Sequence, residues 1–267
     1  MVLLLNPFTI YTAATGFKEK RLMTVSVISK QIQVINGDLA IDAYLATPSE
    51  AGTFPGIVVI QEVFGVNSHI REITETIAKE GYVAIAPAIY QRQAPGFEVG
   101  YSEADLELGR KYKNQTKAEE LLSDIRATIN YLYNLPQVKK SGVGIIGFCF
   151  GGHVAYLAAT LDEIKATASF YGAGITNSCP GGGEPTITRT KDIKGTIYCF
   201  FGTADPFIPN EQVDEIEAEL QKYQISHRVF RYEGADHGFM CDRRSSYNPD
   251  AAKDAWQKVL DLFSQKL

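Results

Sequence analysis

Residues that carry special chemistry are scarce in this chain of 267 residues, which has only four cysteines and four histidines. No two cysteines form a C-x-x-C pair, and the histidines do not have the spacing of zinc ligands. We therefore expect no bound metal and no cofactor. Four cysteines in a chain of this length do not make a disulfide framework, which indicates a reducing compartment and a cytoplasmic protein.

The sequence also lacks an excess of positive charge and any long hydrophobic run. Its formal net charge is −5, so we expect no nucleic-acid partner. The apolar stretch Val2–Leu5 is too short for a signal peptide or a membrane span, so we expect no membrane partner either. We interpret residues 1–24 as an N-terminal extension, with Met23 as an alternative start, and residues 25–267 as one domain. No feature of the sequence specifies an oligomeric state.

Short runs of consecutive apolar residues alternate with amphipathic segments from about residue 56 onward. Strands that are buried on both faces have this pattern, as in a parallel sheet covered by helices. Before these runs, segments 31–36 and 39–45 roughly alternate around Gly37-Asp38, which predicts an antiparallel hairpin at the sheet edge. The predicted parallel strands cover residues 56–61, 82–86, 143–147, 166–171 and 196–201.

Four amphipathic stripes predict helices that pack on this sheet; they begin at Ile70, Leu121, Val213 and Ala252. The alternation of strands and helices predicts an α/β fold with a mostly parallel central sheet, an antiparallel edge hairpin and helices on both faces. Segment 176–194 is rich in glycine and proline and has no periodicity. It is either a lid over a site or a surface excursion.

The strand over 143–147 runs into Gly147-Phe148-Cys149-Phe150-Gly151, with a helix predicted to follow. This is the G-x-nucleophile-x-G elbow of the α/β-hydrolase fold, with cysteine in the position of serine. The turn is so sharp that side chains at Gly147 and Gly151 would collide with neighbouring backbone. Cys149 would stand at a helix N-terminus, whose partial positive charge favours a thiolate. Since no serine lies in such a motif, Cys149 is the predicted nucleophile.

A thiol nucleophile needs a general base, and the four histidines leave a short choice. His69 opens a helix and is expected to be exposed, whereas His153 lies one turn below Cys149 and is expected to be packed or hydrogen-bonded. His227 lies in the alternating segment 226–232. His237 follows that strand in a loop that can reach over the sheet edge, so we predict His237 as the base.

The histidine needs a carboxylate that fixes its tautomer. Asp236 is its neighbour in the chain, but adjacent side chains generally diverge. Asp205 follows the predicted strand over 196–201, and the order Cys149, Asp205, His237 is that of the α/β-hydrolases. We therefore predict Asp205 as the acid.

An oxyanion needs backbone donors. The N–H of Phe150, directly after the nucleophile, and the N–H of Val63, in the loop after the strand over 56–61, are our candidates. Glu62 then lies near Cys149. A carboxylate there would repel the developing charge, and an exposed loop acid is the alternative interpretation.

With these residues in place, the chain resembles the dienelactone hydrolase (carboxymethylenebutenolidase) family over about residues 30–265. Several motifs carry the resemblance in order: residues 61–67 (QEVFGVN), 90–96 (YQRQAPG), the elbow around Cys149, 170–172 (FYG), 202–206 (GTADP) and 234–239 (GADHGF).

The resemblance implies a Cys–His–Asp triad and roles for other residues. It implies that Glu62 takes up the proton of the nucleophile when substrate arrives and that Arg92 anchors the substrate carboxylate. Tyr171 matches a pocket tyrosine, and Phe64 is expected beside it in substrate binding. One departure concerns a second anchoring arginine, expected four residues after the histidine, where this chain has Cys241, followed by Arg243 and Arg244.

The predicted function is hydrolysis of a small-molecule lactone or carboxylic ester, with a carboxylate on the substrate, through a cysteine acyl-enzyme. One alternative is a general carboxylesterase or small-peptide hydrolase on the same fold, which would turn over neutral esters equally well. Another is a non-catalytic ligand-binding or redox-sensing homologue. Such proteins usually lose a member of the triad, and none is missing here.

Overall fold

The structure is a computed structural model that describes residues 26–267, so the extension predicted over residues 1–24 lies outside the described residues. Eight strands and six α-helices, with one 3₁₀-helix, make up this part of the chain. The strands are β1 (Val27–Asn36), β2 (Leu39–Pro48), β3 (Phe54–Ile60), β4 (Val83–Pro87), β5 (Val138–Phe148), β6 (Ile164–Phe170), β7 (Thr196–Gly202) and β8 (His227–Tyr232). The helices are α1 (Ser68–Lys79), α2 (Glu103–Lys113), α3 (Ala118–Asn134), α4 (Phe150–Ala158), η1 (Thr186–Asp192), α5 (Asn210–Lys222) and α6 (Pro249–Lys266).

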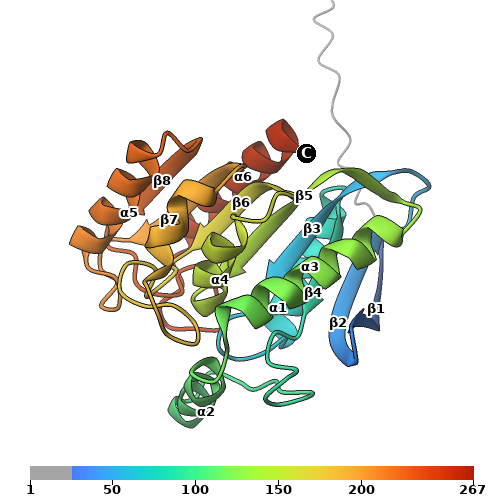
Figure 1. The fold of residues 1–267 in the computed structure, drawn as a ribbon, viewed down its shortest axis with the longest axis horizontal. Coiled ribbons are helices and arrows are strands. Elements are labelled where there is room, and N and C mark those ends of the chain that lie inside the picture. Colours follow the sequence, from blue (N-terminus) through green and yellow to red (C-terminus); the bar gives the residue numbers. More distant parts are fainter. Residues whose placement is uncertain (1–25) are drawn as a thin grey trace, which may run out of the picture.

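All eight strands form one sheet in the order β1-β2-β4-β3-β5-β6-β7-β8 (Figure 1). β1 pairs antiparallel with β2, and β2 antiparallel with β4, whereas every other pair is parallel. The prediction of a mostly parallel sheet with an antiparallel edge hairpin is therefore confirmed. Gly37 opens the hairpin turn with a φ of 60°, which costs glycine little because it has no Cβ.

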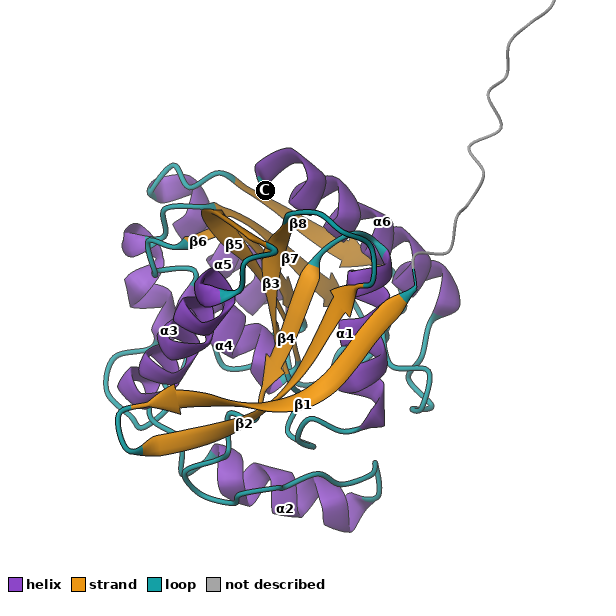
Figure 2. Cartoon of the chain, turned by 90° about the vertical axis from the view of Figure 1, so that its right-hand side faces the viewer, coloured by secondary structure: helices purple, strands orange, loops and turns teal. Residues whose placement is uncertain are grey.

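Helices cover both faces of the sheet, as predicted (Figures 1 and 2). The alternation of side chains along each buried strand divides the apolar residues between two cores. Ile57 and Val59 of β3 contribute to the core shared with α1 and α6, and Val58 and Ile60 to the core shared with α3 and α4. Since both faces are covered, the carboxyl ends of the parallel strands are left to carry the site.

Helix α2 had no counterpart in the sequence prediction. It begins at a capping box in which the side chains of Ser102 and Asp105 each bond the other's backbone N–H. Gly109 is its only buried residue, so α2 has no apolar stripe from which to recognise it. In two perpendicular views α2 stands apart from the sheet at its lower end (Figures 1 and 2).

Segment 176–194 packs along α4. Its helix η1 places Thr186 against His153, with 2.6 Å between Oγ1 and Nε2, and Thr190 against Tyr156, with 2.7 Å between the hydroxyl oxygens. These buried contacts favour the surface excursion over the lid. Among residues 26–267, no helix combines the length and the apolar character needed to cross a membrane.

Candidate active site

Cys149 sits at a strained turn between β5 and α4. Its φ of 55° and ψ of −118° are unusual for a residue with a side chain, and its N–H donates to Phe170 O at 3.1 Å. A Cβ on Gly147 would lie 1.9 Å from Gly151 O, and one on Gly151 would lie 2.4 Å from Gln61 O. The predicted steric need for both glycines is confirmed, and backbone strain of this kind is typical of functional sites.

His237 and Asp205 lie at the same sheet edge, in the loops after β8 and β7. His237 Nδ1 and Asp205 Oδ2 are 2.7 Å apart, and both side chains are buried. The other carboxylate oxygen of Asp205 accepts from the N–H of Phe207 at 2.8 Å, which fixes its orientation. Asp236, the alternative acid, instead accepts from the backbone N–H of His237.

The protonated form of His237 is strongly favoured. Burial by itself lowers the pKa of this imidazole. The charge of a Cys149 thiolate, together with hydrogen bonds to Asp205 and Cys149, raises the pKa by more than burial lowers it. The pKa of His237 is thereby raised to about 10. His237 thus contacts Cys149 on one side and Asp205 on the other, and its positive charge would stabilise a thiolate once that forms.

A cavity of about 110 Å³ joins these groups. Cys149 and His237 line it together with Val63, Phe64 and Phe150. Phe150 is the first residue of α4, so its N–H has no partner within the helix. The two backbone segments predicted as oxyanion donors thus meet at Cys149. Among residues 26–267, no group of three His, Cys, Asp or Glu side chains is placed to hold a metal ion.

Glu62 is deeply buried, with 1% of its side chain exposed. Its Oε1 accepts from Arg244 Nη1 at 3.1 Å, whereas its Oε2 has no hydrogen-bond partner within the described residues. Arg244 also lines the cavity and lies 5.9 Å from the ring centroid of Phe64. Glu62 is therefore a buried carboxylate paired with a residue that lines the cavity, and is not an exposed loop acid.

Comparison with known proteins gives the same assignment. The model of the dienelactone hydrolase family matches residues 41–267. The chain belongs to this family. It is accordingly a hydrolase of the carboxymethylenebutenolidase type, with a small-molecule substrate.

Three relatives illustrate how widely the similarity extends. A Synechocystis protein assigned as a carboxymethylenebutenolidase is 58% identical over 92% of this chain and its own full length. A Bradyrhizobium protein assigned as a 2-oxo-3-(5-oxofuran-2-ylidene)propanoate lactonase is 29% identical over 82% of this chain and 86% of its own. The crystal structure of a protein assigned as a dienelactone hydrolase, from Klebsiella pneumoniae, has a TM-score of 0.81 at 29% identity and covers 90% of this chain and 99% of that chain.

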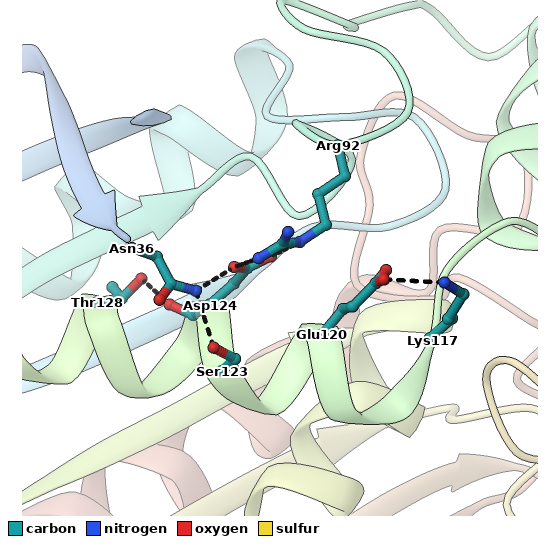
Figure 3. Close-up of polar contacts among 7 residues, drawn as sticks. All are labelled: Asn36, Arg92, Lys117, Glu120, Ser123, Asp124 and Thr128. Atoms are coloured by element: carbon teal, nitrogen blue, oxygen red, sulfur yellow. Dashed lines mark hydrogen bonds and ion pairs between the residues drawn. The ribbon is translucent and has the colours of Figure 1, made fainter. Parts of the chain in front are cut away.

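In this dienelactone hydrolase, Arg92 lies away from the cavity. Its guanidinium donates to both carboxylate oxygens of Asp124 on α3, at 2.6 and 3.1 Å (Figure 3). Asn36 at the end of β1 donates to the same carboxylate at 2.7 Å. Asp124 therefore ties both the edge hairpin, through Asn36, and the loop after β4, through Arg92, to α3. Its predicted role as the carboxylate anchor finds no support in this geometry, because the guanidinium is occupied and does not line the cavity.

Tyr171 packs against His237 but lies outside the cavity. Its ring meets the His237 imidazole edge-on, with 5.2 Å between centroids, and burial raises the pKa of its phenol well above the ordinary value. Tyr171 does not line the cavity, whereas Phe64 does, as expected. The Tyr171 hydroxyl, like Glu62 Oε2, has no hydrogen-bond partner within the described residues.

The other histidines take structural positions. His153 is buried and bonded on both ring nitrogens, to Ala173 O at 3.0 Å and to Thr186, as predicted. The prediction of an exposed His69 is wrong. His69 is buried near Glu62, with its Nδ1 3.8 Å from Asp242 Oδ1, because the first turn of α1 lies against the loop after β8 that carries Asp242.

Sequence reasoning missed Arg244 and one face of α2. Leu106, Arg110 and Lys113 all line the cavity. Helix α2 reaches this position because Gly109 packs on the carbonyl of Val63, where a Cβ would lie 2.3 Å from the oxygen. Their spacing at i, i+4 and i+7 is a detectable signal, but it becomes informative only once α2 is known to lie over the site.

Proposed function

We propose that this enzyme hydrolyses lactones or carboxylic esters that carry a carboxylate, through an acyl-enzyme on Cys149. The observation that carries the proposal is the shared cavity in which the strained Cys149 meets His237, whose other ring nitrogen is bonded to the buried Asp205. Nucleophile, base and orienting acid have the geometry of a triad.

The reaction proceeds in two halves. The Cys149 thiolate attacks the carbonyl carbon, and the N–H groups of Val63 and Phe150 stabilise the oxyanion. Its collapse breaks the carbon–oxygen bond, and the His237 imidazolium donates its proton to the departing alkoxide. Water then attacks the thioester, His237 accepts a proton from that water, and the Cys149 thiolate leaves as the carboxylic acid is released. With a lactone, the alkoxide stays tethered to the acyl group throughout.

Arg244 binds the substrate carboxylate, the role that the family resemblance implied for Arg92. It lines the cavity, and its planar guanidinium matches a carboxylate in a bidentate manner. The name of the Bradyrhizobium relative describes a lactone whose substituent is a propanoate. A substrate of that class brings both the scissile lactone and the anion that Arg244 recognises.

Substrate binding would also activate the nucleophile. A substrate carboxylate on Arg244 competes with Glu62, and a buried carboxylate that loses its cation is costly. Glu62 then accepts the proton of the Cys149 thiol, so thiolate forms when substrate is present, and Glu62 returns this proton to Cys149 after the carboxylic acid has left. The free Oε2 of Glu62 supports this role.

Mass spectrometry of the intact protein after reaction with p-nitrophenyl acetate tests the proposal. We expect a mass increase of one acetyl group, located by peptide mapping at Cys149. Absence of an acyl-enzyme, or acylation of another residue, would contradict the proposal. Equal turnover of neutral and carboxylate-bearing esters would instead favour a general carboxylesterase.

A further inference from the structure

One face of α2 looks into the cavity beside Cys149. Leu106, Arg110 and Lys113 share this face and line the cavity. Lys111 belongs to the same last turn of α2 but does not line the cavity. A cation at a helix C-terminus interacts favourably with the helix dipole, and Lys111 could serve that purpose equally well. The dipole therefore does not explain why two of these cations face the nucleophile.

Neither of the two cations is paired with a carboxylate of the described part of the chain. Within residues 26–267, Arg110 and Lys113 take part in no ion pair, whereas Arg244 in the same cavity is paired with Glu62. The formal net charge of the chain is −5, so carboxylates are not in short supply. Two unpaired cations on the wall of an enzyme cavity indicate an anionic group on the ligand.

Aromatic faces hold both cations in place. The Arg110 guanidinium lies 5.8 Å from the ring centroid of Phe207, and Lys113 Nζ lies 5.7 Å from that of Phe150. Such cation–π contacts position a cation without neutralising it. Phe207 also packs on His237, with 5.1 Å between ring centroids, and Phe150 follows the nucleophile, so both cations are held next to the reacting groups.

Arg244 and Lys113 mark different ends of the cavity. Arg244, with His237, also lines an adjoining hollow of about 410 Å³ that includes Arg243. Lys113, with Phe150, lines a second hollow, of about 390 Å³, beside His153 and Cys179. The two hollows share no lining residue. A ligand held at Arg244 can therefore extend past Cys149 to reach Lys113 at the other end.

We propose that Arg110 and Lys113 form a second anion-binding subsite, so that the preferred substrates are lactones or esters with two anionic groups. Arg244 binds one carboxylate and Lys113 binds the other, with the scissile carbonyl between them at Cys149. Arg110 lies over Phe207, which also lines the Arg244 hollow, and adds positive charge between the two ends. This inference rests on the proposed function for the position of the scissile bond. It adds a dianionic substrate class to the single carboxylate anchored by Arg244.

Calorimetric titration of the full chain with α,ω-dicarboxylates and with monocarboxylates of the same chain length tests this subsite without turnover. Succinate, glutarate and adipate would be compared with butyrate, valerate and hexanoate at low salt, where ion pairing is least screened. We expect at least one dicarboxylate to bind about 10-fold or more tightly than its matched monocarboxylate, as a second charge-assisted contact provides.

Variants locate the effect. Lys113→Gln and the double variant Arg110→Gln/Lys113→Gln should progressively remove the preference for dicarboxylates, whereas Lys111→Gln, which removes the same charge from the outer side of α2, should retain it. No preference in the wild type, a preference that survives in the double variant, or an equal loss in Lys111→Gln would each overturn the inference.

Acylation by p-nitrophenyl acetate is measured in the same preparations. Acylation of Cys149 without a dicarboxylate preference overturns the second subsite alone. A dicarboxylate preference without acylation overturns the proposed function alone.

Discussion

The Arg244 guanidinium donates a 3.1 Å hydrogen bond to the buried carboxylate of Glu62, although the two residues are 182 positions apart in the chain. Arg244 lines the cavity that holds Cys149, and Glu62 lies buried behind it. It joins the loop after β3 to the loop after β8, so one contact links the proposed substrate anchor to the group that we propose activates the nucleophile.

Arg244→Gln should lower kcat/KM for a carboxylate-bearing lactone by about 10- to 100-fold, the scale of a lost charged hydrogen bond. Hydrolysis of a neutral ester should not fall, because that substrate has no carboxylate for Arg244 to bind. Parallel kcat/KM measurements on the two substrates check this, and matching losses would count against the anchor.

Arg92→Gln is the matched control. It removes a loop guanidinium that lies outside the cavity, so the ratio of the two kcat/KM values should stay at the wild-type level. It leaves Asp124, with 4% of its side chain exposed, without its cation. The free energy of unfolding should fall by about 1–3 kcal/mol in urea titrations.

Glu62→Gln separates activation from binding. The amide cannot accept the thiol proton, so kcat should fall by about 10²- to 10⁴-fold, the usual contribution of a general base. KM for a carboxylate-bearing lactone should not rise, since a neutral side chain competes less for Arg244. An unchanged kcat would remove Glu62 from the mechanism.

Alkylation by iodoacetamide should modify Cys149 first and abolish esterase activity, and Cys149→Ala should be inactive. Cys179 serves as an internal control because it is also partly exposed, whereas Cys199 and Cys241 are buried. Cys179 lacks the contact with His237 that favours a thiolate. Peptide mapping identifies the alkylated residue. Full inactivation with Cys149 unmodified would refute the assignment.

Asp205→Asn should leave a folded protein whose kcat is lower by orders of magnitude, since a lost histidine tautomer costs about 10⁴-fold in the serine-protease template. Asp236→Asn should matter far less, because Asp236 contacts the backbone of His237 and not its ring. Steady-state kinetics with circular dichroism as the fold control decide it, and the reverse ranking would identify Asp236 as the acid.

The stability of the enzyme should depend on pH through His237. Its folded-state pKa of about 10 lies above the ordinary value of 6.5. Its protonation therefore stabilises the fold fully below pH 6.5, and this contribution is lost as the pH rises through about 10. The free energy of unfolding should fall more steeply over this window in the wild type than in His237→Gln. Parallel slopes would show that the imidazolium is not stabilised by its surroundings.

Much of the fold and of the site is encoded locally and could be predicted from the sequence. The buried strands are recognisable because both of their faces are apolar, and the elbow because Gly147 and Gly151 leave room for backbone atoms that approach them. Cys149, Asp205 and His237 each follow a predicted strand. In a parallel sheet those strand ends meet at one edge, so chain order alone indicated that these residues come together.

Tertiary structure alone decided which arginine faces the substrate and what covers the site. Arg92 and Arg244 both lie in loops, and only packing shows that Asp124 on α3 occupies the first, while the second bonds Glu62 and lines the cavity. Helix α2 buries too little surface to carry an apolar pattern, so its cationic face became visible only from its place beside Cys149. Long charged side chains take whichever partner the fold brings within reach, and such partners are distant in sequence.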